Sequence, residues 1–223
     1  MTTTSPLVEH LDADARRTSG RGTWRQYLAA VRVLLALTVV LGLGYPLGLT
    51  AIAQLPGLNG RAAGSLVQDR SGTVVGSSLL GQGFVDAGGK PLRQWFQSRP
   101  SAAGRTGWDG TSSGASNLGP TNPDLVRAVE QRRSDVAAFD SVPGHPVSAA
   151  QVPADAVTTS ASGLDPDISP AYARQQAYRV AAARHLPAQQ VLDLVEQHTR
   201  GRDLGFLGEP RVDVLELNLA LPS

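Results

Sequence analysis

Residues 33–53 read VLLALTVVLGLGYPLGLTAIA, an uncharged apolar run near the start of a chain that is polar almost everywhere else. A helix rises about 1.5 Å per residue, so roughly 20 apolar residues cross the ~30 Å hydrocarbon core of a bilayer. The run is long enough, and it is apolar on every face, whereas a helix at the surface of a soluble domain is apolar on one face. The sequence therefore predicts a single N-terminal transmembrane helix, which we place over residues 24–54.

Arginines flank this run unevenly, which predicts its orientation. Basic residues close to a membrane span stay in the cytoplasm. We therefore expect a cell-membrane protein with a disordered cytoplasmic tail over residues 1–23 and an extracytoplasmic domain over residues 55–223. The arginines before the run are Arg16, Arg17, Arg21, Arg25 and Arg32, and those in the twenty residues after it are Arg61 and Arg70.

A cleaved signal peptide is the alternative interpretation of the same run. Ala51-Ile52-Ala53 has the small-x-small form of a cleavage site, and cleavage there would leave a free exported domain that begins at Gln54. The apolar part of a signal peptide spans about 7–15 residues, and this run is longer. We therefore favour a retained anchor, with the large domain exported in either case.

The centre of the run differs from plain lipid-facing sequence. Gly44 and Gly48 form a GxxxG pair, which lets a second helix approach closely, and Tyr45-Pro46 lies between them. Pro46 lacks a backbone donor and is expected to kink the helix. We predict that Gly44, Tyr45, Pro46 and Gly48 form a face that packs against a partner helix.

The remaining residues, about 170 of them, are enough for one domain, and their pattern predicts a mixed α/β (α+β) fold. Strand-like runs at 65–67 and 73–75 flank the turn sequence at 69–72, which predicts a hairpin. The pairs Asn122-Pro123 and Ser169-Pro170 are typical of helix starts. We expect helices from residue 123 to about 139, 170 to about 185 and 187 to about 199, and a half-buried strand over 212–221.

The sequence carries no familiar catalytic or ligand-binding pattern. It has no H-E-x-x-H pair, no G-x-S-x-G elbow, no phosphate-cradling G-x-x-x-x-G-K-[ST] loop and no cysteine. A net charge of +1 gives no reason to expect a nucleic-acid partner. We predict no catalytic residue, no metal and no directly bound cofactor. A membrane-tethered or secreted serine hydrolase using Ser113, Ser160 or Ser162, and an exported binding domain, remain as alternatives.

Short segments spread over most of the chain form a recognisable ordered set. They are Tyr45-Pro46, GSSLLGQ (76–82), WFQSRPS (95–101), SGASNL (113–118), Asn122-Pro123, VTTSASGLD (157–165), ISP (168–170), RVA (179–181) and VLELNLAL (214–221). In this order they resemble the KdpC family, the C subunits of Kdp-type potassium-transporting ATPases. No segment is diagnostic alone, but together they extend from Tyr45 to the C-terminus.

This resemblance implies an accessory, non-catalytic subunit of a high-affinity, ATP-driven potassium uptake complex. The implied partners in the bilayer are a channel-like potassium-binding subunit, a P-type ATPase subunit and a small single-span subunit. The complex uses ATP and potassium, and the family's C subunit is held to be a catalytic chaperone that raises the ATP affinity of the ATPase subunit. The D-K-T-G phosphorylation motif of such ATPases does not occur in this chain.

The resemblance also implies a nucleotide-contacting loop at Ser113, Gly114, Ser116 and Asn117. The predicted topology places this loop outside the cell, away from cytoplasmic ATP, and Thr111 stands where the family has a glutamine. We therefore expect this loop to have a structural role in place of a nucleotide site.

Overall fold

The computed structural model of the protein describes the backbone of residues 6–222 and side chains from residue 22 to residue 222. The chain divides into two compact units, Met1–Ala62 and Ala63–Ser223. The second unit thus begins a few residues later than the expected boundary at residue 55.

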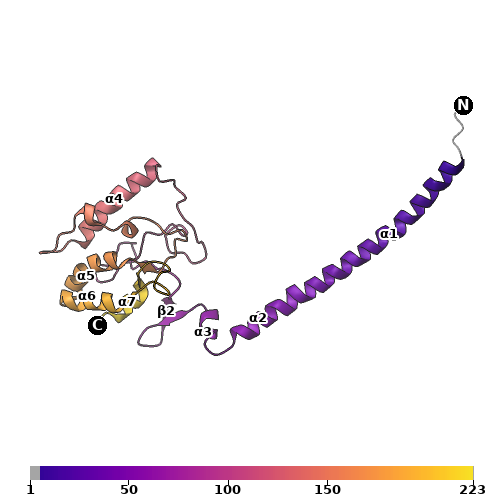
Figure 1. Ribbon diagram of the computed structural model, residues 1–223. Helices are drawn as coiled ribbons and strands as arrows, with labels where there is room; N and C mark the ends of the chain where they lie inside the picture. The colour runs from indigo at the N-terminus through magenta and orange to yellow at the C-terminus, as the bar shows by residue number, and fades with distance from the viewer. Residues whose placement is uncertain (1–5, 223) are drawn as a thin grey trace. The chain divides into compact units, whose positions relative to one another are not determined.

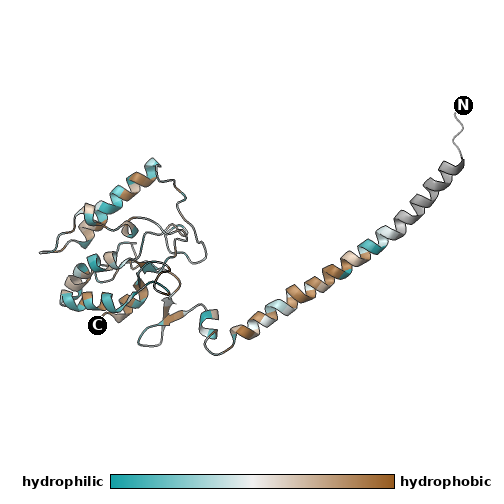
Figure 2. Ribbon diagram, viewed as in Figure 1, coloured by the Kyte–Doolittle hydropathy of each residue, from teal (hydrophilic) through white to brown (hydrophobic). Residues whose placement is uncertain are grey.

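The first unit is dominated by a long helical segment (Figure 1). It consists of α1 (Pro6–Val39), a single π-helical turn η1 (Val40–Gly44) and α2 (Tyr45–Ala53), followed by the short helix α3 (Asn59–Ala62). Gly22–Ala53 is the one stretch of the described chain that is long and apolar enough to cross a membrane, with a mean hydropathy of 2.1. Figure 2 shows this apolar character along α2 and the adjoining part of α1. One apolar helix is therefore present where the sequence predicted it.

Helix α1 begins at Pro6, within the tail over residues 1–23 for which disorder is expected. Proline suits the first turn of a helix, where its missing N–H has no partner to lose. The segment that follows is rich in Leu, Ala and Arg, which favour helices, and its glycines come only at Gly20 and Gly22. Residues 1–5 lie outside the described residues.

The second unit begins with the predicted hairpin. Strands β1 (Leu66–Gln68) and β2 (Val74–Ser77) pair antiparallel, with Val67 opposite Gly76. Asp69 closes the turn by accepting hydrogen bonds from the backbone N–H groups of Ser71 and Thr73, at 2.9 and 3.0 Å. No named helix or strand follows until residue 123.

Three predicted helices are confirmed: α4 (Pro123–Asp140), α5 (Pro170–Arg184) and α6 (Ala188–Gln197). Asn122 and Ser169 cap the first two helices by accepting from Asp124 N and Tyr172 N, as their cap-and-proline sequences predicted. Two short 3₁₀ turns, η2 (Ala149–Gln151) and η3 (Ala154–Ala156), lie between α4 and α5.

The predicted C-terminal strand is wrong over most of its length. Strand β5 (Arg211–Asp213) ends after three residues, and α7 (Val214–Ala220) follows at once. The side chain of Asp213 accepts from Glu216 N at 2.8 Å, which caps a helix at the point where the alternating pattern begins. β5 is the central strand of an antiparallel sheet, between β3 (Asp167–Ile168) and β4 (Thr199–Arg200).

The core of the second unit is built around α5. Its small residues Ala173 and Ala177 are fully buried, which allows α6 and the sheet to approach closely. Phe96, from the long segment between β2 and α4, is also fully buried in this core. The other large contributors are Val180, Val191, Val195, Val212, Val214 and Leu217.

Candidate functional site

The predicted packing face of the apolar helix begins at the π-helical turn. Tyr45 N donates to Val40 O, one residue further back than in an α-helix. Pro46 follows directly and has no N–H to donate, so the regular ladder is interrupted at this point. Thr50 Oγ1 donates to Pro46 O at 2.8 Å. The irregularity expected at Pro46 therefore takes the form of a π turn on its N-terminal side.

The two glycines of the GxxxG pair are open within their own chain. A Cβ on Gly48 would meet no atom within 4 Å, and one on Gly44 would meet only Val39 O, at 3.7 Å. The side chain of Tyr45 is exposed. Within the part of the first unit whose side chains are described, no contact therefore requires glycine at these two positions.

The Ser113–Gly114 pair lies against the 160–165 segment of the chain. Ser113 Oγ donates to Ser162 O at 3.0 Å, and Gly114 N donates to the same carbonyl at 2.9 Å. Ser116 is exposed, and Asn117 adopts a left-handed conformation with φ of 52°. The loop is thus held by hydrogen bonds to the Ser162 carbonyl, which lies in a second segment of the family resemblance.

Gly163 makes this contact possible. It has a φ of +68°, and an added Cβ would lie 2.6 Å from Gly114 O and 2.7 Å from Ala103 N. Ser101 Oγ donates to Gly163 O at 2.6 Å and accepts from Trp108 N at 2.8 Å. Segments around residues 101, 114 and 163 therefore meet backbone to backbone, which only glycine permits at position 163.

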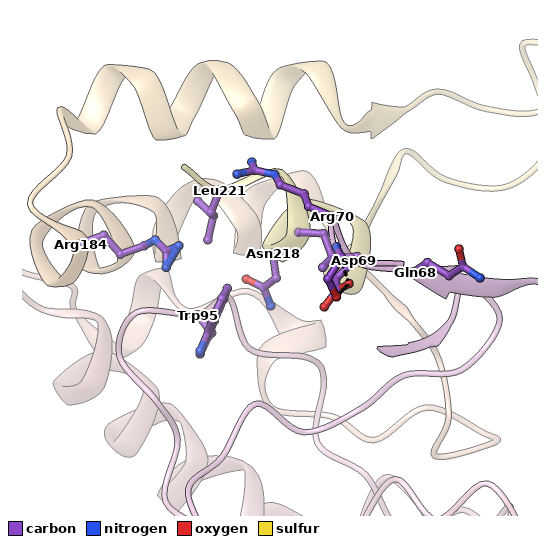
Figure 3. Close-up of a pocket in the computed structure, with 9 residues that line it drawn as sticks. Gln68, Asp69, Arg70, Trp95, Arg184, Asn218 and Leu221 are labelled. Atoms are coloured by element: carbon purple, nitrogen blue, oxygen red, sulfur yellow. Dashed lines mark hydrogen bonds between the residues drawn. The ribbon is translucent and has the colours of Figure 1, made fainter. Parts of the chain in front are cut away.

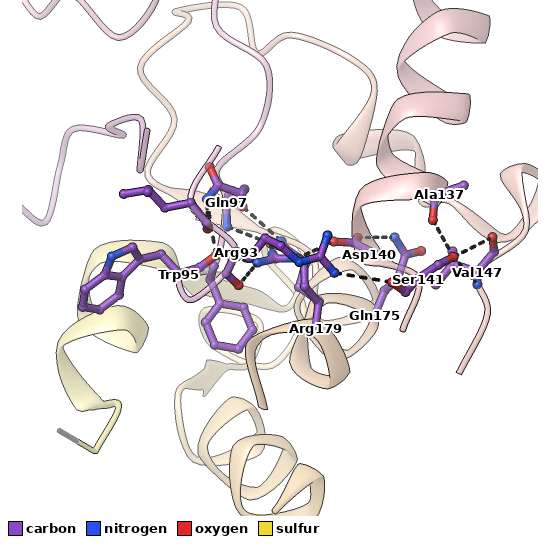
Figure 4. Close-up of polar contacts among 12 residues, drawn as sticks. Arg93, Trp95, Gln97, Ala137, Asp140, Ser141, Val147, Gln175 and Arg179 are labelled. Atoms are coloured by element: carbon purple, nitrogen blue, oxygen red, sulfur yellow. Dashed lines mark hydrogen bonds and ion pairs between the residues drawn. The ribbon is translucent and has the colours of Figure 1, made fainter. Parts of the chain in front are cut away.

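A buried arginine organises the centre of the second unit (Figure 4). Arg179 Nε donates to Asp140 Oδ1 at 2.8 Å, and Nη1 donates to Trp95 O at 3.0 Å and also to Arg93 O. Its guanidinium carbon lies 4.5 Å from the centre of the Phe139 ring. This one side chain ties the end of α4 and the 93–95 segment to α5.

Two buried amides complete the attachment of the 93–98 segment. Asn218 accepts from Phe96 N at 2.8 Å and donates to Phe96 O at 3.0 Å. Gln176 makes the equivalent pair with Gln97, accepting from N at 2.7 Å and donating to O at 3.1 Å. In the WFQS segment the backbone N–H and C=O groups of Phe96 and Gln97 therefore bond to side-chain amides, whereas in a sheet they would bond to a neighbouring strand.

The sequence interpretation did not identify this network. The signals were present, since WFQS, Arg179 and Asn218 all lie in segments of the family resemblance, but their spacing along the chain gives no indication that they meet. Two glycines that precede the WFQS segment in the sequence also have no room for a side chain. A Cβ on Gly81 would lie 2.4 Å from Asp165 O, and one on Gly83 would lie 2.8 Å from the Trp108 ring.

A buried carboxylate lies at the junction of β5 and α7. Asp213 is opposite Asp167 in the sheet, and its Oδ2 has no hydrogen-bond partner. Burial raises the pKa of Asp213 to about 6, and the nearby charges of Glu216 and Asp167 act in the same direction. Burial also raises the pKa of Asp167. Asp213 is therefore expected to take up a proton as the pH falls toward its pKa of about 6.

The serines proposed for a hydrolase are not paired with histidine in the described part of the chain. His145 stacks on Tyr178 with 3.4 Å between ring centres, and His198 Nδ1 lies 2.9 Å from Leu194 O. His185 ends α5 in a left-handed conformation. Among the side chains that the structure describes, from residue 22 to residue 222, no group of three His, Asp or Glu could hold a metal ion.

A shallow pocket of about 550 Å³ lies beside the hairpin turn (Figure 3). Gln68, Asp69 and Arg70 line one side, and Trp95 and Arg184 line another. The Arg184 guanidinium lies 4.8 Å from the Trp95 ring centre and donates to Pro222 O at 2.8 Å. These contacts join α5 to the WFQS segment and to the C-terminus.

The chain combines one apolar helix that is long enough to span a membrane with an α+β unit whose buried polar side chains hold its backbone segments together. These features define a candidate membrane-anchored accessory protein. The comparisons identify its family. The family model described as "KdpC: K+-transporting ATPase, c chain" matches residues 27–223. The chain therefore belongs to the KdpC family.

Curated relatives bear the name "Potassium-transporting ATPase KdpC subunit" and match over nearly their whole length. A protein of Kineococcus radiotolerans is 54% identical over 199 residues, covering 89% of this chain and 94% of the relative. One of Streptomyces coelicolor is 49% identical over 209 residues, covering 88% and 92%. One of Acidobacterium capsulatum is 50% identical over 192 residues, covering 86% and 95%. The family is named as a subunit of the ATPase complex, distinct from a catalytic enzyme.

Proposed function

We propose that this chain is the accessory subunit that assembles and braces a potassium-transporting ATPase in the cell membrane. Its apolar helix packs on the channel-like potassium-binding subunit, and its second unit stabilises the outer face of the complex. The P-type ATPase subunit hydrolyses ATP, and a small single-span subunit completes the assembly. Family membership together with the open glycine face at Gly44 and Gly48 supports this function.

The effect on ATP affinity is indirect in this proposal. Ser113 Oγ and Gly114 N both donate hydrogen bonds to Ser162 O, so these two donors already have a partner. The chain raises the ATP affinity of the ATPase subunit by stabilising one arrangement of the partner subunits. A nucleotide site at Ser113, Gly114, Ser116 and Asn117 is not needed for this role.

Purification of the tagged chain from native membranes in mild detergent tests the assembly. Co-purification of a P-type ATPase and a channel-like subunit, with potassium-stimulated ATP hydrolysis, is the expected result. Purified chain without partners, or a mature protein that begins at Gln54, would overturn the proposal. The N-terminal sequence of the same sample separates an anchored subunit from a released exported domain.

The proposed orientation can be tested by labelling single introduced cysteines. The chain itself contains no cysteine, so it adds no labelling of its own. Ser134 is exposed on α4, and Thr18 precedes the apolar run. A membrane-impermeant maleimide added to intact cells is expected to label Ser134→Cys and to leave Thr18→Cys unlabelled until the cells are opened. Labelling in the reverse order would place the large unit in the cytoplasm.

A further inference from the structure

The loop between β4 and β5 presents large apolar side chains to solvent. Leu204, Phe206 and Leu207 are 83%, 69% and 49% exposed. Every residue from 201 to 210 is exposed, so none of these side chains contributes to the core of the second unit. We call Leu204, Phe206 and Leu207 the apolar tip. Single exposed apolar residues are ordinary, but three gathered on one loop need an explanation.

The loop has a defined shape. Asp203 N donates to Leu207 O and Leu207 N donates to Asp203 O, both at 2.9 Å. Leu204 and Gly205, between them, have φ of 54° and 82°. Leucine rarely adopts a left-handed conformation, because its Cβ crowds the backbone, and glycine or asparagine would be easier there. The chain therefore holds a leucine at a position that disfavours it, with its side chain almost wholly in solvent.

The charges around the apolar tip are engaged in ion pairs, one of which reaches outside the loop, since Arg211 Nε lies 3.4 Å from Asp167 Oδ2. Arg202 Nη2 lies 2.7 Å from Glu209 Oε2, and Arg211 Nη2 lies 3.5 Å from Asp203 Oδ2. These two arginines and two carboxylates sum to zero. Segments that bind anionic lipid carry Lys or Arg around their apolar residues, often with tryptophan, and this loop offers neither an excess of basic charge nor a tryptophan. A preformed neutral loop fits an apolar pocket on a protein.

We propose that the apolar tip docks into an uncharged apolar pocket on the outer face of another subunit of the same ATPase complex. This inference rests on the proposed function, which supplies the partner. Leu204 and Phe206 act as the anchors, and the backbone hydrogen bonds between Asp203 and Leu207 hold them in position before binding. Preorganisation lowers the entropy lost when the surfaces meet, which accounts for a leucine kept in a strained turn.

Photocrosslinking in the assembled complex tests this contact. A benzophenone amino acid replaces Phe206 in the full chain, the complex is irradiated in native membranes, and the adduct is identified by mass spectrometry. An adduct with another subunit of the complex is the expected result. Adducts confined to lipid or to a second copy of this chain would overturn the inference, as would absence of any adduct from a complex that purifies intact.

Variants of the turn separate binding from folding. Leu204→Asn keeps a residue that tolerates a left-handed conformation, so the chain is expected to unfold at the same or a higher temperature. Combined with Phe206→Asn, it is expected to lower co-purification with the partner subunits at least fivefold in a detergent titration. Gly201→Ala, in open space on the same loop, is the matched control and is expected to leave co-purification unchanged.

If the double variant co-purifies with the partner subunits as well as the wild-type chain does, docking through the apolar tip is wrong and the proposed function still stands. If the unaltered chain itself captures no partner subunit, both the inference and the proposed function are wrong.

Discussion

Asp140 and Arg179 form an ion pair with 2.8 Å between Oδ1 and Nε, and their side chains are 1% and 0% exposed. The two residues come from α4 and α5, and Gln175 Nε2 donates to the other carboxylate oxygen of Asp140 at 2.7 Å. Buried charges are tolerated only when each is matched and hydrogen-bonded. The packing of α4 against α5 therefore requires both residues, because removing either one leaves the other as an unmatched buried charge.

Loss of one member of this pair is expected to destabilise the chain strongly. Arg179→Met leaves Asp140 buried without its charge partner, at a cost of about 3–5 kcal/mol in the free energy of unfolding. The double variant Asp140→Leu/Arg179→Met removes both charges and is expected to lose less than the sum of the single changes. Denaturant titration of the full chain in detergent measures all three. Strictly additive losses would contradict the coupling.

The amide clamp on Phe96 depends on a group that both donates and accepts. Asn218→Asp keeps the acceptor for Phe96 N but removes the donor to Phe96 O, and it buries a charge. We expect a loss of about 1–3 kcal/mol in the free energy of unfolding. Gln190→Glu, on the exposed side of α6, is the matched control and is expected to change stability little. Equal effects from the two changes would show that the clamp contributes nothing.

The contact between the Ser113–Gly114 loop and the 160–165 segment makes a prediction at Gly163. Gly163→Ala combines a left-handed φ with a clash against Gly114 O, so a loss of about 3 kcal/mol or more is expected. Gly144→Ala has a similar φ of +79° in open space, and only about 1 kcal/mol is expected. Thermal unfolding compares the two variants. Similar losses at both glycines would contradict a close backbone approach.

Asp213 predicts a pH dependence of stability. Its pKa is about 6 in the folded chain, above the ordinary value of 3.8. A raised carboxyl pKa means that the folded state holds the proton more tightly, so this contribution is full below about pH 4 and is lost as the pH rises through 6. Asp213→Asn still caps α7 and is expected to be more stable than wild type near pH 7, by on the order of 2 kcal/mol. Unfolding curves from pH 4 to 8 test this, and an unchanged difference between the two proteins across that range would refute the assignment.

Assembly rather than folding is expected to be sensitive to the glycine face of the apolar helix. The Cβ of a leucine at Gly44 or Gly48 would meet little or nothing in the described part of its own chain, so the helix is expected to form as before. A partner helix would no longer approach as closely, and recovery of the intact complex is expected to fall severalfold. Gly42→Leu, two residues from Gly44 and so turned to another side of the helix, is the control. Intact complex recovered from both variants would contradict the packing face.

Local signals in the sequence predicted the parts of the structure that depend on neighbours along the chain. The apolar helix follows from the length of one uncharged run, and α4 and α5 begin where an oxygen-bearing side chain precedes proline. The hairpin at β1 and β2 follows from a turn sequence between two apolar runs. At the C-terminus the alternation of leucines at 215, 217, 219 and 221 predicted a strand, and this prediction was wrong. Asp213 caps a helix there, and because this short helix is buried on more than one side, its apolar residues can alternate as they do in a strand.

By itself the sequence determined the apolar helix, the class of the second unit, the starts of its main helices and its family, since each depends on residues that are close together or on an ordered set of segments. Only the tertiary structure decided that Arg179 meets Asp140, that Asn218 and Gln176 hold the WFQS segment, and that Gly163 seats the Ser113–Gly114 loop. Phe96 and Asn218 are more than a hundred residues apart, 122 positions along the chain. Contacts of that range follow from the packing of whole elements in a shared core, and no local pattern of residues encodes them.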